Sequence, residues 1–394
     1  MPRWIWEDED WPYFRFDVTA LTGPLARARL AEGRVLGAVQ SLDAPLSEET
    51  AARILTEDSL RTSAIEGESL PLDAVRSSVA RHLGLPTGGL PPPARKIDGL
   101  VEVLLDATQR HDQPLTVERL CRWQAALFPT AQSGLTPIRV GALRGDAPMQ
   151  VVSGPIGRQR VHFEAPPEVA LAPQLEHFVE WFNAPPANLD GLVRAGLAHL
   201  WFVTLHPFED GNGRLARALT DMAIAQDEHE PMRWFSLSTQ LEHERAAYYE
   251  TLERTQRGTV DVTPWLVWFL EQVALAAEAA QGVLQLTVAK AKFWMGARDL
   301  ELNARQRKVL NRLLDGFEGV LTNRNYMSLT KTSRATATRE LAALVELGLL
   351  EPIGAGRSRS YQLCGPTIVS ARRLGRLGGS EPALTPTRRR RSKP

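Results

Sequence analysis

The sequence is poor in cysteine, and Cys121 and Cys364 lie far apart without a CxxC pair or a Cys/His cluster. Neither a disulfide framework nor a structural zinc site is therefore expected. Long uninterrupted apolar runs are also lacking, because Arg, His or Glu interrupts each of them, including Trp265 to Ala280. Since Met1 to Asp10 has no basic segment followed by an apolar one, the sequence predicts a soluble, cytoplasmic protein with no membrane partner.

No excess of either charge is present, because 46 Lys and Arg residues balance 46 Asp and Glu residues. No overall field therefore draws the whole chain to nucleic acid. The charges are unevenly spread, however: residues 1–299 carry 28 basic and 39 acidic side chains, whereas residues 300–394 carry 18 and 7. We expect any polyanionic partner to meet the C-terminal quarter.

The 394 residues, of which 43% are hydrophobic, are enough for two or three domains with their own cores. Apolar positions at helical spacing predict a mainly α fold. Two short β-like runs, Met149–Ser153 and Arg160–Phe163, predict one hairpin. The expected helices are two within Glu48–Leu85, broken near Gly67 and Pro71, and then Ile97–Arg110, Thr116–Phe128, Pro173–Asn183, Gly191–Leu205, Gly213–Asp227, Ser238–Gln256 and Thr263–Val283.

The pattern of apolar and polar residues changes at Ala304. Helical patterns at Arg305–Leu314 and Thr332–Leu347 are followed by two β-like runs, 349–353 and 360–363, that flank a basic turn. This order is typical of a winged helix-turn-helix. From residue 366 the chain is rich in Arg, Gly, Pro and Ser, and it predicts a disordered tail.

The residues that carry chemistry run from His206 to Arg217, HPFEDGNGRLAR. An apolar helix delivers His206 to a loop, and a Gly-Asn-Gly turn opens a second helix whose N-terminus suits a phosphate chain. Arg214 and Arg217, three residues apart, can fork onto phosphate oxygens, Asp210 can hold Mg²⁺, and His206 can take a proton from a hydroxyl. Together they predict phosphoryl or nucleotidyl transfer. The alternative is a helix-capping loop with a solvated Arg pair.

The match from His206 to Arg217 is complete against the signature HPFx(D/E)GN(G/K)RxxR, so the sequence resembles the Fic (filamentation induced by cAMP) family. The resemblance implies a helical core with one hairpin and the transfer of AMP from ATP to a hydroxyl of a target protein. Gly213 stands where kinases of the superfamily usually have Lys, which favours AMP transfer over phosphorylation.

The resemblance also implies a role for each residue of the site. His206 would be the general base, Asp210 the Mg²⁺ ligand and Arg217 the residue that holds the γ-phosphate of ATP. Tyr249, in an RxxYYxxL pattern, would lie beside the base of the nucleotide. The alternative is that Tyr249 packs in the core. The nucleotide-binding residues implied are Phe208, which also anchors the loop, Glu209, Asp210, Gly211, Asn212, Gly213, Arg214, Arg217 and Tyr249.

The hairpin would be the flap that pairs with an extended target segment, or else a plain surface hairpin. Its flap residues are Met149, Gln150, Val151 and Val152.

Upstream, Thr62 to Gly67 matches the family's inhibitory motif, (S/T)xxxE(G/N). The resemblance implies that Glu66 pairs with Arg217 and denies it to ATP, so the chain would inhibit itself. The alternative is that Glu66 is a solvated helix residue and Thr62 an N-cap. Near the N-terminus, the tryptophans Trp4, Trp6 and Trp11 are expected to anchor the core.

In the C-terminal domain, Arg334 and Thr338 lie off the apolar stripe of their helix, and Arg357 and Arg359 lie at the wing tip. These four residues are candidates for DNA binding, with a protein-contact module as the equal alternative. Arg388–Arg391 could add phosphate contacts or be a solvated tail.

The sequence thus predicts an N-terminal helical domain (1–89) with the inhibitory motif, a Fic catalytic core (94–285), a winged helix (300–365) and a basic tail (366–394). The expected function is an auto-inhibited protein adenylyltransferase, with a nucleotide-sensing transcriptional regulator as the alternative. The expected partners are ATP, Mg²⁺ and a target protein with a Ser, Thr or Tyr hydroxyl. DNA binding, a homodimer and removal of AMP by the same site stay open at this stage.

Overall fold

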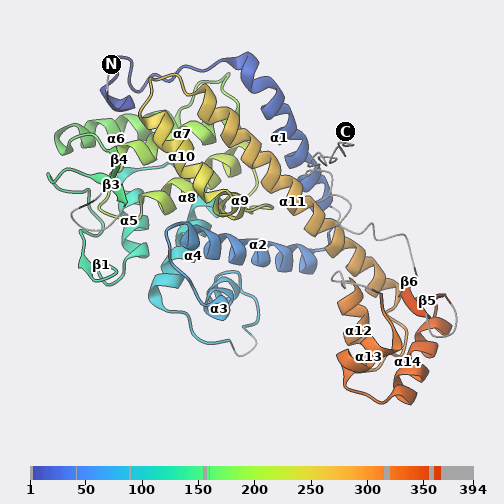
Figure 1. Cartoon of the computed structure of the whole chain (residues 1–394). Helices are drawn as coiled ribbons and strands as arrows, with labels where there is room; N and C mark the ends of the chain where they lie inside the picture. The colour runs from blue at the N-terminus through green and yellow to red at the C-terminus, as the bar shows by residue number, and fades with distance from the viewer. Residues whose placement is uncertain are drawn as a thin grey trace, which may run out of the picture. The chain divides into compact units, whose positions relative to one another are not determined.

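The structure is a computed structural model that describes residues 3–40, 42–87, 90–153, 158, 160–314, 320–354 and 359–364. It is mainly helical, as the sequence predicts, and within these ranges it contains three two-stranded antiparallel sheets (Figure 1). The chain divides into two compact units, residues 1–281 and residues 282–394. Cys121 in the first unit and Cys364 in the second are free thiols.

The first unit is a helical assembly with two short hairpins. Its elements are η1 (Ile5–Glu7), α1 (Val18–Val39), α2 (Ala44–Ile65), α3 (Leu72–His82), α4 (Arg95–Gln109), α5 (Val117–Leu127), β1 (Gln132–Ser133), β2 (Thr136–Pro137), β3 (Gln150–Ser153), β4 (Arg160–Glu164), α6 (Glu168–Asn183), α7 (Gly191–Leu205), α8 (Asn212–Glu228), α9 (Leu237–His243), α10 (Arg245–Gln256) and most of α11 (Thr263–Gly296).

The core of this unit is built on α7 and α8. Every residue of α7 is buried, as is expected for a helix that is apolar on all sides. Asp190 caps α7 by accepting from the N–H of Leu192 at 2.9 Å. Helix α8 packs against α7 and also contacts α4 and α2 (Figure 1). The site described below lies where α7 ends and α8 begins.

In the first unit the structure confirms the expected helices, although α6 begins earlier, at Glu168, and α11 continues to Gly296, and it differs further at three places. Helix α1 was missed, because glycines and Pro24 interrupt its pattern. The stretch expected as one helix from Ser238 to Gln256 is two, which meet at Glu244. The expectation of a single hairpin in this unit was wrong, because β1 and β2 form a second one. Its strands have two residues each, too few for an alternating pattern.

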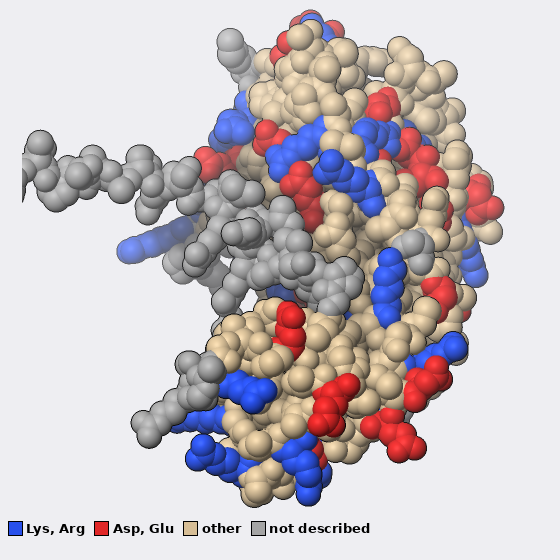
Figure 2. All heavy atoms as spheres, turned by 90° about the vertical axis from the view of Figure 1, so that its right-hand side faces the viewer, with Lys and Arg blue, Asp and Glu red and all other residues tan. Residues whose placement is uncertain are grey.

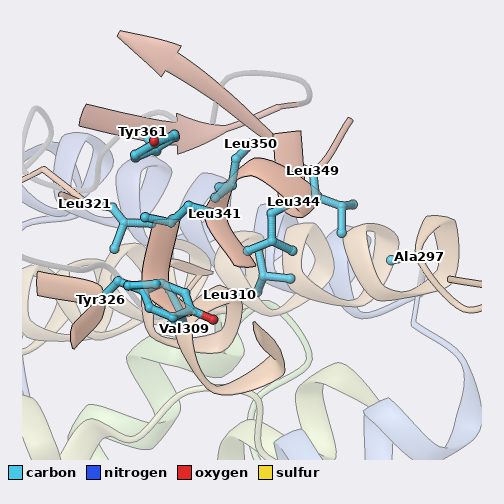
Figure 3. Close-up of a cluster of buried hydrophobic side chains, with 11 residues drawn as sticks. Ala297, Val309, Leu310, Leu321, Tyr326, Leu341, Leu344, Leu349, Leu350 and Tyr361 are labelled. Atoms are coloured by element: carbon cyan, nitrogen blue, oxygen red, sulfur yellow. The ribbon is translucent and has the colours of Figure 1, made fainter. Parts of the chain in front are cut away.

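Among the described residues, the second unit comprises the end of α11, three short helices and a hairpin around a core of its own. The elements are α12 (Ala304–Leu314), α13 (Asn323–Thr330), which the sequence analysis missed, α14 (Arg334–Glu346), β5 (Leu350–Ile353) and β6 (Ser360–Leu363). Leu321 bridges to Tyr361 beside the hairpin. Figure 3 shows the cluster at the centre of this unit, which includes Val309, Leu310, Tyr326, Leu341, Leu344 and Tyr361. The tail 366–394, with Arg388–Arg391, lies outside the described residues.

In the part of the chain that the structure describes, no helix has both the length and the apolar character needed to cross a membrane.

Leu341 tests whether the second unit depends on this core. Its side chain is fully buried among the cluster, so Leu341→Ala should lower the free energy of unfolding of this unit by about 2–5 kcal/mol. Leu347→Ala is the matched control, because Leu347 ends the same helix and is 37% exposed; it should cost less than about 0.5 kcal/mol. Urea titration of the full chain measures both, and equal losses would contradict the packing described here.

Candidate functional site

His206 follows the last residue of α7 and adopts the left-handed conformation, with φ 49°. Its N–H donates to the carbonyl of Phe202, which closes the helix. Because the carbonyl of Val203 can only accept, Nδ1 of the ring donates to it at 3.2 Å. This assigns the proton of the neutral ring to Nδ1 and leaves Nε2 as the proton acceptor.

Burial lowers the pKa of His206, and the positive charge of Arg144 lowers it further. The hydrogen bond to Val203 and the negative charges of Glu66 and Asp210 oppose this shift. The imidazole is therefore neutral near pH 7. A neutral ring with a free Nε2 is the form that a general base requires.

Arg144 clamps the backbone of this loop, and the sequence analysis missed it. Its side chain is nearly fully buried and donates to the carbonyl of His206 at 2.9 Å and to that of Pro166 at 2.5 Å. Its backbone N–H donates to the carbonyl of Pro207 at 3.0 Å. Since Arg144 lies 62 residues before His206 in a segment without a motif, no local signal could have identified it.

The loop between the helices is closed by Asn212. Its side-chain oxygen accepts from the N–H of Phe208 at 3.0 Å, and its side-chain nitrogen donates to the carbonyl of Phe208 at 2.8 Å. Phe208 is fully buried. Gly211 has φ +91°, and a Cβ there would lie 2.9 Å from the ring of Phe128. The Asn212 side chain therefore shapes the loop, and the N-terminus of α8 is an end of a helix that suits an anion.

The two acidic residues of the loop contact the segment around β1. Asp210 accepts a hydrogen bond from the hydroxyl of Ser133 and another, at 2.5 Å, from the N–H of Gly211. Glu209 accepts from the N–H of Arg139 at 2.9 Å. Ser133 and Arg139 carry no sequence motif, and the hairpin that presents Ser133 was itself not expected.

Asp210 fits the role of a Mg²⁺ ligand, although it stands alone. Among the described residues, no group of three or more Asp, Glu, His or Cys side chains could hold a metal ion. Mg²⁺ usually takes one or two protein carboxylates together with substrate phosphates. A single carboxylate beside the N-terminus of α8 is compatible with that arrangement.

Arg217 is 2% exposed, and it donates three hydrogen bonds to residues at the end of α2. Its guanidinium donates to the hydroxyl of Thr62 at 2.7 Å, to the carbonyl of Thr62 at 2.9 Å and to Oε1 of Glu66 at 2.7 Å. Burial opposes the charge of Arg217, but Glu66 outweighs it and raises the pKa of the guanidinium above its usual value. The alternative for Thr62 was wrong, because Asp43 caps α2 and Thr62 lies in its last turn.

Arg214 lies one turn earlier on α8 and is also nearly buried. Its Nη1 is 3.4 Å from Oε2 of Glu68, and its guanidinium lies 4.9 Å from the centre of the Phe128 ring. Nε of Arg214 and Nη1 of Arg217 are buried without a hydrogen-bond partner among the described residues. These spare donors suit a bound polyanion.

The turn after α2 brings both glutamates to the arginines. Gly67 has φ +81°, and its N–H donates to the carbonyl of Ala64 at 2.9 Å. The N–H of Glu68 donates to the carbonyl of Ser63 at 2.9 Å. This is the Schellman arrangement, which favours glycine at the left-handed position. The (S/T)xxxEG pattern therefore encodes the helix end as well as the acidic side chain.

Tyr249 lies at the edge of the site on α10. Its hydroxyl donates to the carbonyl of Ile65 at 3.3 Å, and the side chain is 39% exposed. Burial raises the pKa of Tyr249, and the charge of Glu66 adds to the effect. The neighbouring Tyr248 holds the core position instead, with its hydroxyl 2.8 Å from Nε2 of the buried His199. Tyr248, and not Tyr249, is therefore the tyrosine that packs in the core.

The predicted hairpin forms as β3 and β4, paired antiparallel with an irregularity between Val151 and Val152. Met149 precedes β3, and Gln150 pairs with Glu164 at the base. The base is fixed to the N-terminal segment: the indole of Trp6 donates to the carbonyl of Glu164 at 2.7 Å, and the buried Trp4 packs edge-on against Phe163. Trp4 and Trp6 are thus packing residues.

In the second unit, Arg334 and Thr338 lie on α14. The hydroxyl of Thr338 already accepts from Asn323 at 2.7 Å and donates to the carbonyl of Arg334 at 2.9 Å. Arg359 lies over the ring of Tyr361, and Arg357 is outside the described residues. On the face shown in Figure 2, basic and acidic side chains are interspersed, and neither sign covers it alone.

Comparison with known families gives two matches. Residues 4–85 match a domain of unknown function, DUF4172, and residues 114–224 match the Fic/DOC family.

Two relatives are similar over part of the chain. Protein adenylyltransferase fic-1 of Caenorhabditis elegans is 34% identical over 108 residues, 27% of this chain and 19% of the relative. Protein adenylyltransferase Fic of Aedes aegypti is 33% identical over 93 residues, 23% of this chain and 17% of the relative. The chain thus matches about a fifth of the length of these relatives.

Among solved structures, a Fic family protein from Desulfovibrio desulfuricans G20 superposes with a TM-score of 0.51 at 19% identity, over 89% of this chain and 98% of that one. At this identity the likeness concerns the fold. The fold, the complete loop from His206 to Arg217 and the family match agree, and the chain therefore carries a domain of the Fic/DOC family at residues 114–224.

Proposed function

We propose that this protein is an auto-inhibited protein adenylyltransferase, which transfers AMP from ATP to a hydroxyl side chain of a target protein. The observation that carries the proposal is the shared loop. It holds a neutral His206 with Nε2 free and two buried arginines with spare donors at the start of one helix. The relatives named protein adenylyltransferase support the same reaction.

In the proposed reaction, the triphosphate of ATP lies at the N-terminus of α8, with Arg214 and Arg217 on its oxygens. The oxygen of a target Ser, Thr or Tyr hydroxyl attacks the α-phosphorus while its proton passes to Nε2 of His206. The bond from the α-phosphorus to the bridging oxygen breaks, and pyrophosphate leaves with its electron pair. When bound, Mg²⁺ held by Asp210 supplies positive charge to the phosphates.

The loop contributes by fixing these positions before substrate arrives. Arg144 and Asn212 hold its backbone, so the donors of the anion site need no reorganisation at the moment of transfer. Tyr249 would border the nucleotide base. The flap strand with Gln150, Val151 and Val152 would receive an extended segment of the target.

Self-inhibition follows from the contacts of Glu66. Its carboxylate holds Arg217 at 2.7 Å, and a Cβ placed on Gly213 would lie 2.2 Å from its Oε1. Glu66 therefore occupies the start of α8, where the γ-phosphate would lie. ATP that binds against this carboxylate loses the contact that would orient it for transfer.

For the second unit we propose a winged helix, because α12, α13 and α14 precede the hairpin β5–β6 in the order that this fold requires. The predicted partner of this winged helix is DNA or a protein. Association of the chain into a homodimer is also a prediction. The nucleotide-sensing regulator is not favoured, since sensing ATP needs neither a base nor a metal ligand.

His206→Ala should lower AMP transfer on the order of a hundredfold or more, because it removes the base, while ATP binding stays nearly intact. His243→Ala is the control, since His243 is exposed and distant in sequence from the loop. Self-labelling with radiolabelled ATP and Mg²⁺ measures transfer, and calorimetry measures binding. A His206→Ala protein that labels at the wild-type rate would refute the assignment.

Glu66→Gly should raise AMP transfer by about tenfold, because it frees Arg217 from a charged hydrogen bond. Arg217→Ala should lower transfer, and the double variant should stay low, because release of an absent arginine gains nothing. The same labelling assay measures all three proteins. Additive effects in the double variant would show that the two residues do not act as a pair.

If the winged helix binds DNA, the full chain should bind duplex DNA with an affinity that falls steeply with salt. Arg334→Ala should weaken binding and reduce the slope of log affinity against log salt by about one. Arg53→Ala, an exposed change on α2, should leave both unchanged. Fluorescence anisotropy measures these values, and no binding at low salt would leave a protein-contact module.

A further inference from the structure

A second glutamate lies on the phosphate-binding arginines. Oε2 of Glu68 is 3.4 Å from Nη1 of Arg214, just as Oε1 of Glu66 is 2.7 Å from Nη2 of Arg217. The inhibitory motif implied by the resemblance ends at Gly67, so it assigns nothing to Glu68. Both arginines that would hold the triphosphate are thus paired with carboxylates from one turn.

Glu68 is held in this position from two sides. Its backbone N–H closes the turn by donating to the carbonyl of Ser63. Its other carboxylate oxygen, Oε1, accepts from Nζ of Lys96 on α4 at 2.5 Å. Because Lys96 and Arg214 take different oxygens, Lys96 fixes the carboxylate without displacing Arg214.

Because Arg214 is buried, its ion pair with Glu68 should be stronger than an ion pair on the surface. The side chain of Arg214 is 4% exposed, whereas that of Glu68 is 30% exposed. A buried guanidinium next to the Phe128 ring gains from any anion that satisfies it. An ATP phosphate and the Glu68 carboxylate would therefore compete for the same donor.

We propose that Glu68 is a second inhibitory carboxylate, which competes with the inner phosphates of a nucleotide for Arg214 while Glu66 competes with the γ-phosphate for Arg217. This inference rests on the proposed function, because it uses the same triphosphate site. The two glutamates then differ in what they oppose. Glu66 acts only on a nucleotide that has a γ-phosphate, whereas Glu68 acts on nucleoside diphosphates and triphosphates alike.

ADP separates the two roles without any need for transfer. Calorimetry of the full chain with Mg²⁺ at fixed salt would give the dissociation constants of ATP and ADP. The proteins compared are wild type, Glu66→Gln, Glu68→Gln, the double variant and Glu48→Gln. Glu48 is the matched control, because it is an exposed glutamate at the start of α2, the helix that precedes Glu66 and Glu68.

Glu68→Gln should tighten both ATP and ADP by about threefold to tenfold, which is about 0.7–1.4 kcal/mol. Glu66→Gln should tighten ATP and leave ADP unchanged, and the double variant should bind ATP most tightly. Self-labelling should rise further in Glu66→Gly/Glu68→Gln than in Glu66→Gly alone. Glu48→Gln should match the wild type in every measurement.

The proposal fails if Glu68→Gln leaves ADP binding within twofold of the control, or weakens it, while Glu66→Gln still tightens ATP. That result would leave the proposed function intact. The proposed function itself fails if no protein of the set binds ATP or labels protein. Thermal melting of each variant checks that Glu68→Gln remains folded, because Glu68 also contacts Lys96.

Discussion

The buried guanidinium of Arg217 is the constraint around which the first unit is arranged. A charge that is 2% exposed must find partners inside the protein, and Arg217 takes three acceptors from the last turn of α2. Helix α2 belongs to the N-terminal segment, whereas α8 belongs to the Fic/DOC domain. The same ionic contact therefore joins these two segments and, in the proposed function, occupies an arginine that would bind the nucleotide.

Buried carboxyl groups also lie between α2 and its neighbours. Asp221, one turn beyond Arg217, is buried, and its pKa is raised by burial and by the charge of Asp58 on α2. Asp58 in turn accepts from the hydroxyl of Ser236 at 2.6 Å. A displacement of α2 would expose or unpair several of these groups at once. In the proposed function, relief of inhibition by loss of the Glu66 side chain would therefore cost less than relief by movement of the whole helix.

The loop that follows His206 takes its backbone hydrogen bonds from other residues than those that hold Arg217. Arg144 and Asn212 satisfy the loop backbone from within the Fic/DOC domain. Glu66 and Glu68 contact the side chains of Arg217 and Arg214, whereas Arg144 and Asn212 contact the backbone of the loop. In the proposed function, inhibition therefore acts on the two arginines, while the loop backbone has hydrogen bonds of its own.

The sequence by itself determined the helical class and the loop from His206 to Arg217, because each is written in a contiguous pattern. The pairing of Glu66 with Arg217 was implied only by the resemblance to the Fic family, since the two residues lie 151 positions apart. Periodicity marks helices, and a twelve-residue motif carries its own spacing. Only the tertiary structure decided that Arg144 clamps the loop, that Ser133 contacts Asp210 and that Glu68 reaches Arg214. The first two of these contacts join residues 62 and 77 positions apart, and the third joins residues 146 apart. Such contacts arise from how helices pack, and no local pattern of residues records them.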